Sequence, residues 1–179
     1  DRDATYTVAA VAMGEVPSSA RARMELFRLP RDLAPAVQRA LESQQAGARG
    51  DMTEAAGARE RHWMAAATAW GQLGEPSLQA DALLQLGALR YGELQAWDRA
   101  RVAASAALAL FEASRDDKSV ADSALLLGMI EIERERTLGA PGVEPPSLRA
   151  LQKARRIYLE LKLPAAAAEV RNNVGIKRF

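Results

Sequence analysis

The chain of 179 residues carries 24 basic and 23 acidic side chains, for a formal net charge of +1, and it contains no cysteine. Its length allows one domain or one continuous repeat array with a sizeable core. The balanced charge gives no electrostatic basis for binding nucleic acid or a membrane surface, and the lack of cysteine excludes disulfides, thiolate metal sites and a cysteine nucleophile from this sequence. No apolar run approaches the roughly 20 residues that a membrane helix needs.

Residues 1–30 differ from the rest in composition and predict a short β-hairpin. The runs TYTVAAVAM and ARARMELFRL flank the turn-forming GEVPSS, and the second run alternates apolar and polar residues as strands do. A lone hairpin is marginal in water, so we expect it to be the tail of an upstream β domain or to dock on helices. Since the chain begins at Asp1 without methionine and its last pattern stops at Phe179, we expect a segment of a longer protein.

Residues 31–179 predict a helical array. They are rich in Ala, Leu, Glu, Gln and Arg, which favour helices, and their apolar residues recur at three- and four-residue spacing between Gly and Pro breaks. About seven helices are expected, over 32–46, 52–72, 77–94, from 98 onward, 118–136, 147–162 and from 164 onward, the last of them truncated.

The stretch from Ala66 to Gly87 returns at Ala107 to Gly128 and at Ala154 to Gly175. A fixed period of this size indicates a solenoid of stacked units, here over 51–95, 96–136 and 147–179. We assign the extra residues of the longer second interval to the Pro- and Gly-rich loop 137–147. The Gly that ends each copy predicts close approach of a neighbouring helix, which only a residue without Cβ allows. Each copy has an aromatic residue, a helix start and an acidic residue at fixed positions: Trp70, Pro76 and Asp81, then Phe111, Asp117 and Asp122, then Tyr158, Pro164 and Glu169.

Catalytic chemistry has little support in the sequence. His62 is the only histidine. As a general base it would need a nucleophile to activate, and the sequence has no cysteine and no serine motif near it. The carboxylates of Glu131, Glu133 and Glu135 predict a solvated charged face, in which Glu131 pairs with Arg134 three residues on. No phosphate loop, zinc spacing or dinucleotide fingerprint is present. We therefore expect no enzyme activity, no catalytic residue, no cofactor and no metal site.

The stretch LGALRYGELQAWDRARVAASAAL resembles the core of tetratricopeptide (TPR) repeats, with Leu86, Gly87, Ala100, Ala104 and Ala107 at consensus-type positions. It has one extra residue between Gly87 and Ala100, and its units are longer than usual, as in extended TPR variants of large bacterial proteins. The resemblance implies an all-α fold, a right-handed superhelical solenoid of antiparallel helix pairs after the hairpin. It also implies a non-catalytic protein–protein interaction scaffold that binds a peptide or partner domain in its concave groove.

The order of features, a hairpin followed by this array, resembles the region before the TPR array in bacterial proteins that end in a CHAT domain, a caspase-like peptidase module. The alternative function is therefore the regulatory arm of such a peptidase, with its catalytic domain outside this chain. Either reading places the chain in a multidomain bacterial protein, in the cytoplasm or exported. An array cut within a unit exposes an apolar helix face, so a homodimer through the truncated last repeat is also expected.

In TPR arrays the first helix of each pair lines the groove, and the resemblance projects one set of residues from each unit onto that face. The acidic row Asp81, Asp122 and Glu169 suits a basic or amine-bearing peptide, although an acid in the second turn also favours a helix N-terminus by itself. The expected groove residues are Asp81, Leu84, Gln85, Ala88, Tyr91, Asp122, Leu125, Leu126, Met129, Ile132, Glu169, Asn172, Asn173 and Ile176.

Overall fold

A computed structural model describes residues 6–7, 26–27, 38–39, 41–43, 45–46, 56–139 and 145–177. From residue 56 onward, every regular element within the described ranges is a helix, so the predicted all-α class is confirmed there. Residues 38–39, 41–43 and 45–46 are also helical, within the first predicted helix. The helices are α2 (Ala56–Gln72), α3 (Pro76–Gly92), α4 (Trp97–Ser114), α5 (Asp117–Leu138), α6 (Pro146–Glu160) and α7 (Pro164–Lys177).

Two short strands lie in the N-terminal region, β1 (Tyr6–Thr7) and β2 (Leu26–Phe27). They pair antiparallel, with Tyr6 opposite Phe27 and Thr7 opposite Leu26. The predicted turn GEVPSS lies outside the described residues, so the hairpin as a whole stays a prediction.

The three helix starts predicted from the repeat are confirmed, since α3, α5 and α7 begin at Pro76, Asp117 and Pro164. Proline suits the first turn of a helix because the amide hydrogen that it lacks would have no partner there. At α5, Asp116 provides a side-chain cap, in which the Ser119 N–H donates to its Oδ1 at 3.1 Å.

The turns before these helices repeat one backbone geometry. Gly74, Arg115 and Lys162 occupy the same position in the three copies, and all have positive φ, at 73°, 58° and 58°. In each turn the amide of the following residue donates to the carbonyl of the repeated aromatic residue, over 3.0, 3.1 and 2.8 Å for Trp70, Phe111 and Tyr158. This pattern is the Schellman ending of a helix. The sequence repeat therefore encodes a helix end, a left-handed residue and the next helix start.

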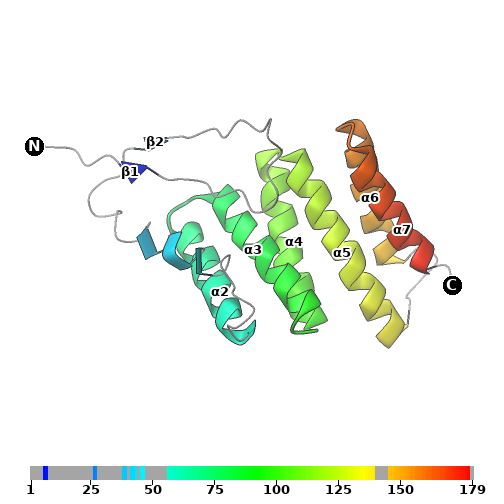
Figure 1. Ribbon diagram of the computed structural model, residues 1–179, viewed down its shortest axis with the longest axis horizontal. Helices are drawn as coiled ribbons and strands as arrows, with labels where there is room; N and C mark the ends of the chain where they lie inside the picture. The colour runs from blue at the N-terminus through cyan, green and yellow to red at the C-terminus, as the bar shows by residue number, and fades with distance from the viewer. Residues whose placement is uncertain are drawn as a thin grey trace, which may run out of the picture.

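Neighbouring helices pack side by side in chain order (Figure 1), and α3 also contacts α5, as α5 contacts α7. The close approach predicted at the repeated Gly is confirmed at two positions. A Cβ on Gly87 would lie 3.3 Å from the Ala104 backbone nitrogen of α4, and one on Gly128 would lie 2.6 Å from Leu151 of α6. At Gly175 the structure describes the helical backbone alone, so the third close approach stays a prediction.

The core is built from the repeated positions. Ala66, Ala107 and Ala154 are fully buried, and the aromatics one turn later, Trp70, Phe111 and Tyr158, are at most 3% exposed. Each buried ring makes a substantial hydrophobic contribution to the stability of the fold. The aromatic side chains are therefore packing residues between helices.

Candidate functional site

The predicted groove residues lie on α3, α5 and α7, and nearly all keep some exposure to solvent. Leu126 is the exception and corrects the projection. It is 9% exposed and packs in a core cluster with Ala100 and Ala104 of α4, because it turns toward Gly87 of the preceding unit. Leu84, Leu125 and Ile132 are partly buried against a core cluster, so they support the fold as well as the surface. The side chain of Ile176 lies outside the described residues.

Three of the predicted residues meet in one hollow, which we name the α5–α7 hollow. Asp122 and Leu125 come from α5 and Glu169 comes from α7. Its volume is about 540 Å³. Its lining consists of Lys118, Asp122, Leu125, Tyr158, Leu163, Pro164, Ala165, Ala166 and Glu169. The other predicted groove residues lie outside this hollow: Asp81, Leu84, Gln85, Ala88, Tyr91, Met129, Ile132, Asn172 and Asn173.

Asp122 is held from two sides within the α5–α7 hollow. The Tyr158 hydroxyl donates to its Oδ1 at 2.6 Å, and the Lys118 ammonium group lies 2.7 Å from its Oδ2. Burial, followed by the hydrogen bond to Asp122, raises the pKa of Tyr158 above its usual range. The phenol therefore stays neutral and remains the hydrogen-bond donor to Asp122.

Asp81, at the equivalent position of the preceding unit, meets different surroundings. Desolvation of its carboxyl, followed by the charge of Asp116, raises its pKa to about 6. Although the residue as a whole is exposed, desolvation is the larger of these two causes. In the acidic row, the Asp122 carboxylate thus has two partners, whereas the Asp81 carboxyl ionises at some cost in free energy.

Lys118 and Tyr158 were missed as site residues by the sequence analysis. The i,i+4 spacing of Lys118 and Asp122 was the available signal, because such residues are neighbours on a helix. Tyr158 could have been singled out as the only one of the three repeated aromatics that carries a hydroxyl. Its partner lies on another helix, which no local pattern indicates.

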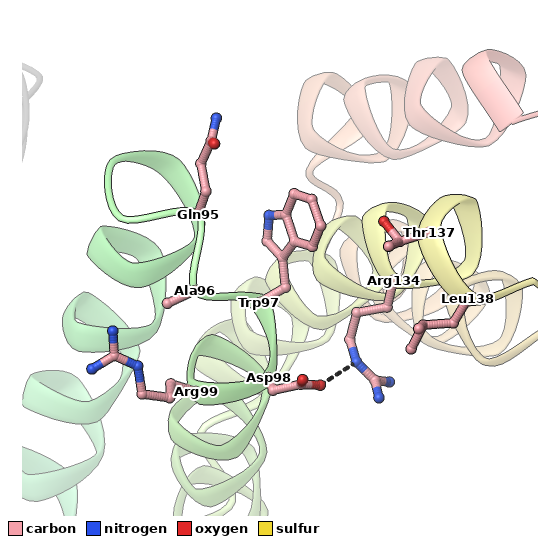
Figure 2. Close-up of a pocket in the computed structure, with 8 residues that line it drawn as sticks. All are labelled: Gln95, Ala96, Trp97, Asp98, Arg99, Arg134, Thr137 and Leu138. Atoms are coloured by element: carbon pink, nitrogen blue, oxygen red, sulfur yellow. Dashed lines mark hydrogen bonds and ion pairs between the residues drawn. The ribbon is translucent and has the colours of Figure 1, made fainter.

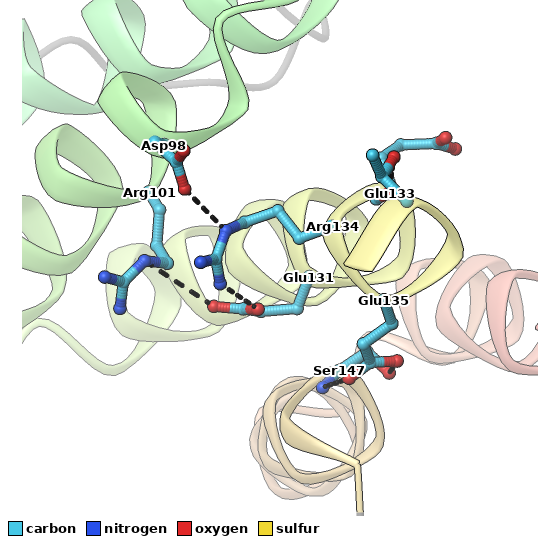
Figure 3. Close-up of polar contacts among 8 residues, drawn as sticks. Asp98, Arg101, Glu131, Glu133, Arg134, Glu135 and Ser147 are labelled. Atoms are coloured by element: carbon cyan, nitrogen blue, oxygen red, sulfur yellow. Dashed lines mark hydrogen bonds and ion pairs between the residues drawn. The ribbon is translucent and has the colours of Figure 1, made fainter. Parts of the chain in front are cut away.

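The glutamates of α5 correct a second expectation. Glu131 and Glu135 are 9% and 8% exposed, so the predicted solvated face is wrong at both. Glu131 does accept from Arg134 at 2.8 Å, as predicted, and Arg101 of α4 lies 3.9 Å from its other oxygen. Arg134 in turn donates to Asp98 at 2.8 Å (Figure 3). These contacts join α4 to α5.

Glu135 closes the N-terminus of α6. The Ser147 N–H donates to Glu135 Oε1 at 3.0 Å, and the Ser147 hydroxyl donates to Oε2 at 2.8 Å (Figure 3). A carboxylate at this end of a helix satisfies a free amide and suits the helix dipole. The buried charge is therefore structural.

Two further hollows lie at the C-terminal end of α5. One, of about 310 Å³, is lined by Trp97 and by the pair Asp98–Arg134 (Figure 2). The other, of about 650 Å³, lies beside the pairs of Glu131 and Glu135. Most of the charged groups that line them already have partners, whereas the α5–α7 hollow contains residues from the predicted groove.

Two other kinds of feature, metal-ligand clusters and membrane-spanning helices, are absent from the described part of the chain. It contains no cluster of three or more His, Asp or Glu placed to hold a metal ion. None of its helices combines the length and the apolar character needed to cross a bilayer. Comparison with protein-family models, curated proteins and solved structures finds no match for this chain.

Proposed function

We propose that this chain is a non-catalytic protein–protein interaction module that binds a peptide or partner domain along the face formed by α3, α5 and α7. The observation that carries the proposal is the α5–α7 hollow, in which groove residues from two of these helices form one open concavity. Its polar groups are few and lie beside an apolar wall, which is the usual character of a recognition site.

The TPR resemblance supports the same face, and we propose that the helix pairs continue as a right-handed solenoid with this face on its inner side. Contacts between α3 and α5 and between α5 and α7 favour that curvature, because helices on the inner side of a curved array lie closer together. A shared face across several units offers a long surface for an extended partner.

Panning a random peptide library against the full chain tests the proposal. The variant with Tyr91→Ala, Met129→Ala and Asn172→Ala removes one side chain from each of the three helices, all at positions with some exposure. We expect enriched peptides to bind the native chain and to lose at least about tenfold in affinity for the variant, since a few contact residues carry most binding energy.

Val102→Ala provides the control, because Val102 is 64% exposed on α4 and lies outside the proposed face. Circular dichroism should show equal helicity for all three proteins. Enriched peptides that bind the triple variant as tightly as the native chain would place the site elsewhere, and failure to enrich any peptide would contradict peptide binding itself.

A further inference from the structure

In the α5–α7 hollow a lysine of the chain occupies a place that suits a ligand cation. Lys118 reaches Asp122 Oδ2 at 2.7 Å, and its side chain is 65% exposed. An exposed i,i+4 ion pair contributes little free energy, so it exchanges readily with solvent or with another cation. Asp122 is therefore open to a competing ammonium group.

We propose that the α5–α7 hollow binds a lysine side chain of the partner peptide, whose ammonium group replaces that of Lys118 on Asp122. This inference rests on the proposed function, because it specifies what the α3–α5–α7 face recognises. Lys118 is an internal competitor, and it leaves the carboxylate when the ligand enters.

The charges of the hollow complement such a ligand. Its charged lining residues are the carboxylates of Asp122 and Glu169 and the ammonium group of Lys118, so the hollow has a negative balance. Apolar residues of α5, of the turn before α7 and of its first turn form the remaining wall: Leu125, Leu163, Pro164, Ala165 and Ala166. A lysine side chain matches this combination, because its methylene chain packs on apolar surface while its charged end stays polar.

The hydrogen bond from Tyr158 favours lysine over arginine. The phenol occupies Asp122 Oδ1 at 2.6 Å, which leaves Oδ2 as the oxygen that a ligand approaches. A guanidinium group gains most from bidentate contact with both carboxylate oxygens, whereas an ammonium group acts as a point charge. Asp122 therefore offers one oxygen atom to an incoming cation, and a single contact of this kind suits an ammonium group better than a guanidinium group.

The test follows the amide signals of Leu125 and Ala166 by NMR while small probes are added to the full chain. The probes are the Nα-acetyl methylamides of lysine, arginine and norleucine. We expect saturable shifts with lysine, weaker binding with arginine and none with norleucine, which has the same carbon chain without charge.

Three variants sharpen the result. Asp122→Asn keeps an oxygen for Tyr158 but removes the charge, so lysine binding should fall at least about tenfold. Lys118→Met removes the competitor while keeping its stem, so binding should strengthen about twofold or more. Asp117→Asn removes an equal charge from the exposed start of the same helix and should leave binding within about twofold of native.

The outcomes separate this inference from the proposed function. Replacing each lysine of a library-selected peptide by norleucine should weaken its binding to native protein and not to Asp122→Asn. Selected peptides that lack lysine, or that bind equally after replacement, would overturn the lysine site and leave peptide binding intact. Equal shifts with all three probes would also overturn it, and a library that enriches no peptide would overturn both.

Discussion

Carboxylates at one position of successive units have different surroundings, and an oxygen atom on a neighbouring ring is one cause of the difference. Asp122 accepts a hydrogen bond from the Tyr158 hydroxyl. Asp81 occupies the same position one unit earlier, where the equivalent aromatic is Phe111, which has no hydroxyl. Desolvation, followed by the charge of Asp116, raises the pKa of Asp81 to about 6, as expected for a carboxyl without a donor to favour its charged form.

The pH dependence of stability should report this difference. Because the folded-state pKa of Asp81 lies above the usual value of 3.8, the folded state binds its proton more tightly than the unfolded state. The contribution of Asp81 to the free energy of unfolding should therefore fall as pH rises from about 4 to about 6. Asp81→Asn removes this titration, so urea unfolding should show the variant more stable than native protein above pH 6, with the gap closing toward pH 4.

A second variant checks the cause. Phe111→Tyr copies the arrangement of Tyr158 and Asp122, and carbonyl NMR titration should show the pKa of Asp81 falling below its native value. A native Asp81 that titrates near 4 would contradict the prediction. An unchanged pKa in Phe111→Tyr would show that the new hydroxyl does not reach the carboxyl.

The turns between α2 and α3, α4 and α5, and α6 and α7 share the left-handed residue of the Schellman ending. Glycine occupies it in the first turn, at Gly74, but Arg115 and Lys162 occupy it in the others with φ of 58°. A residue with a Cβ in this conformation costs about 1–2 kcal/mol. The later two turns therefore carry strain that the first avoids.

Arg115→Gly and Lys162→Gly should each stabilise the protein by about 0.5–1 kcal/mol, since the greater freedom of glycine in the unfolded chain offsets part of the relief. Thermal unfolding would measure the change. Gly74→Ala should destabilise by a similar amount, although no atom lies within 4 Å of the added Cβ. Ser114→Gly, in the last helical position of α4, is the control and should destabilise, because glycine there gains nothing from positive φ.

The spacing of helices across the array depends on residues without side chains. A Cβ on Gly87 would meet backbone atoms, the nitrogen of Ala104 at 3.3 Å and the carbonyl oxygen of Ala100 at 3.4 Å. Backbone of a packed helix yields less easily than the end of a side chain. The separation of α3 and α4 is therefore fixed at van der Waals contact.

Gly87→Ala should destabilise the protein by about 1–2 kcal/mol, because forcing the helices apart outweighs the better helix propensity of alanine. Gly92→Ala is the matched control on α3, since nothing lies within 4 Å of its added Cβ, and it should be neutral or stabilising. Denaturant unfolding of both variants measures the difference. Equal effects of the two substitutions would show that the contact between α3 and α4 does not limit their approach.

Helix class and helix starts were predictable because they depend on local residues. Proline, glycine and aspartate around positions 74–76, 115–117 and 162–164 act on their own turns. Tyr158–Asp122 and Glu135–Ser147 were not predictable, because each joins helices whose relative rotation the local pattern leaves undefined. The projection of Leu126 was wrong for the same reason, and Glu131 and Glu135 were taken for surface residues because charge alone gave no sign of a neighbouring helix.

Because the turns share one backbone geometry, a whole unit can be deleted and the remaining helices joined by a turn of the same form. Joining Gly74 directly to Asp116 would delete residues 75–115 and still place a left-handed glycine before a capping aspartate and the start of α5, as the first and second turns do separately. The same junction rule permits duplication. The array can therefore change length by whole units, through recombination or design, because each new junction keeps the residues of an existing turn.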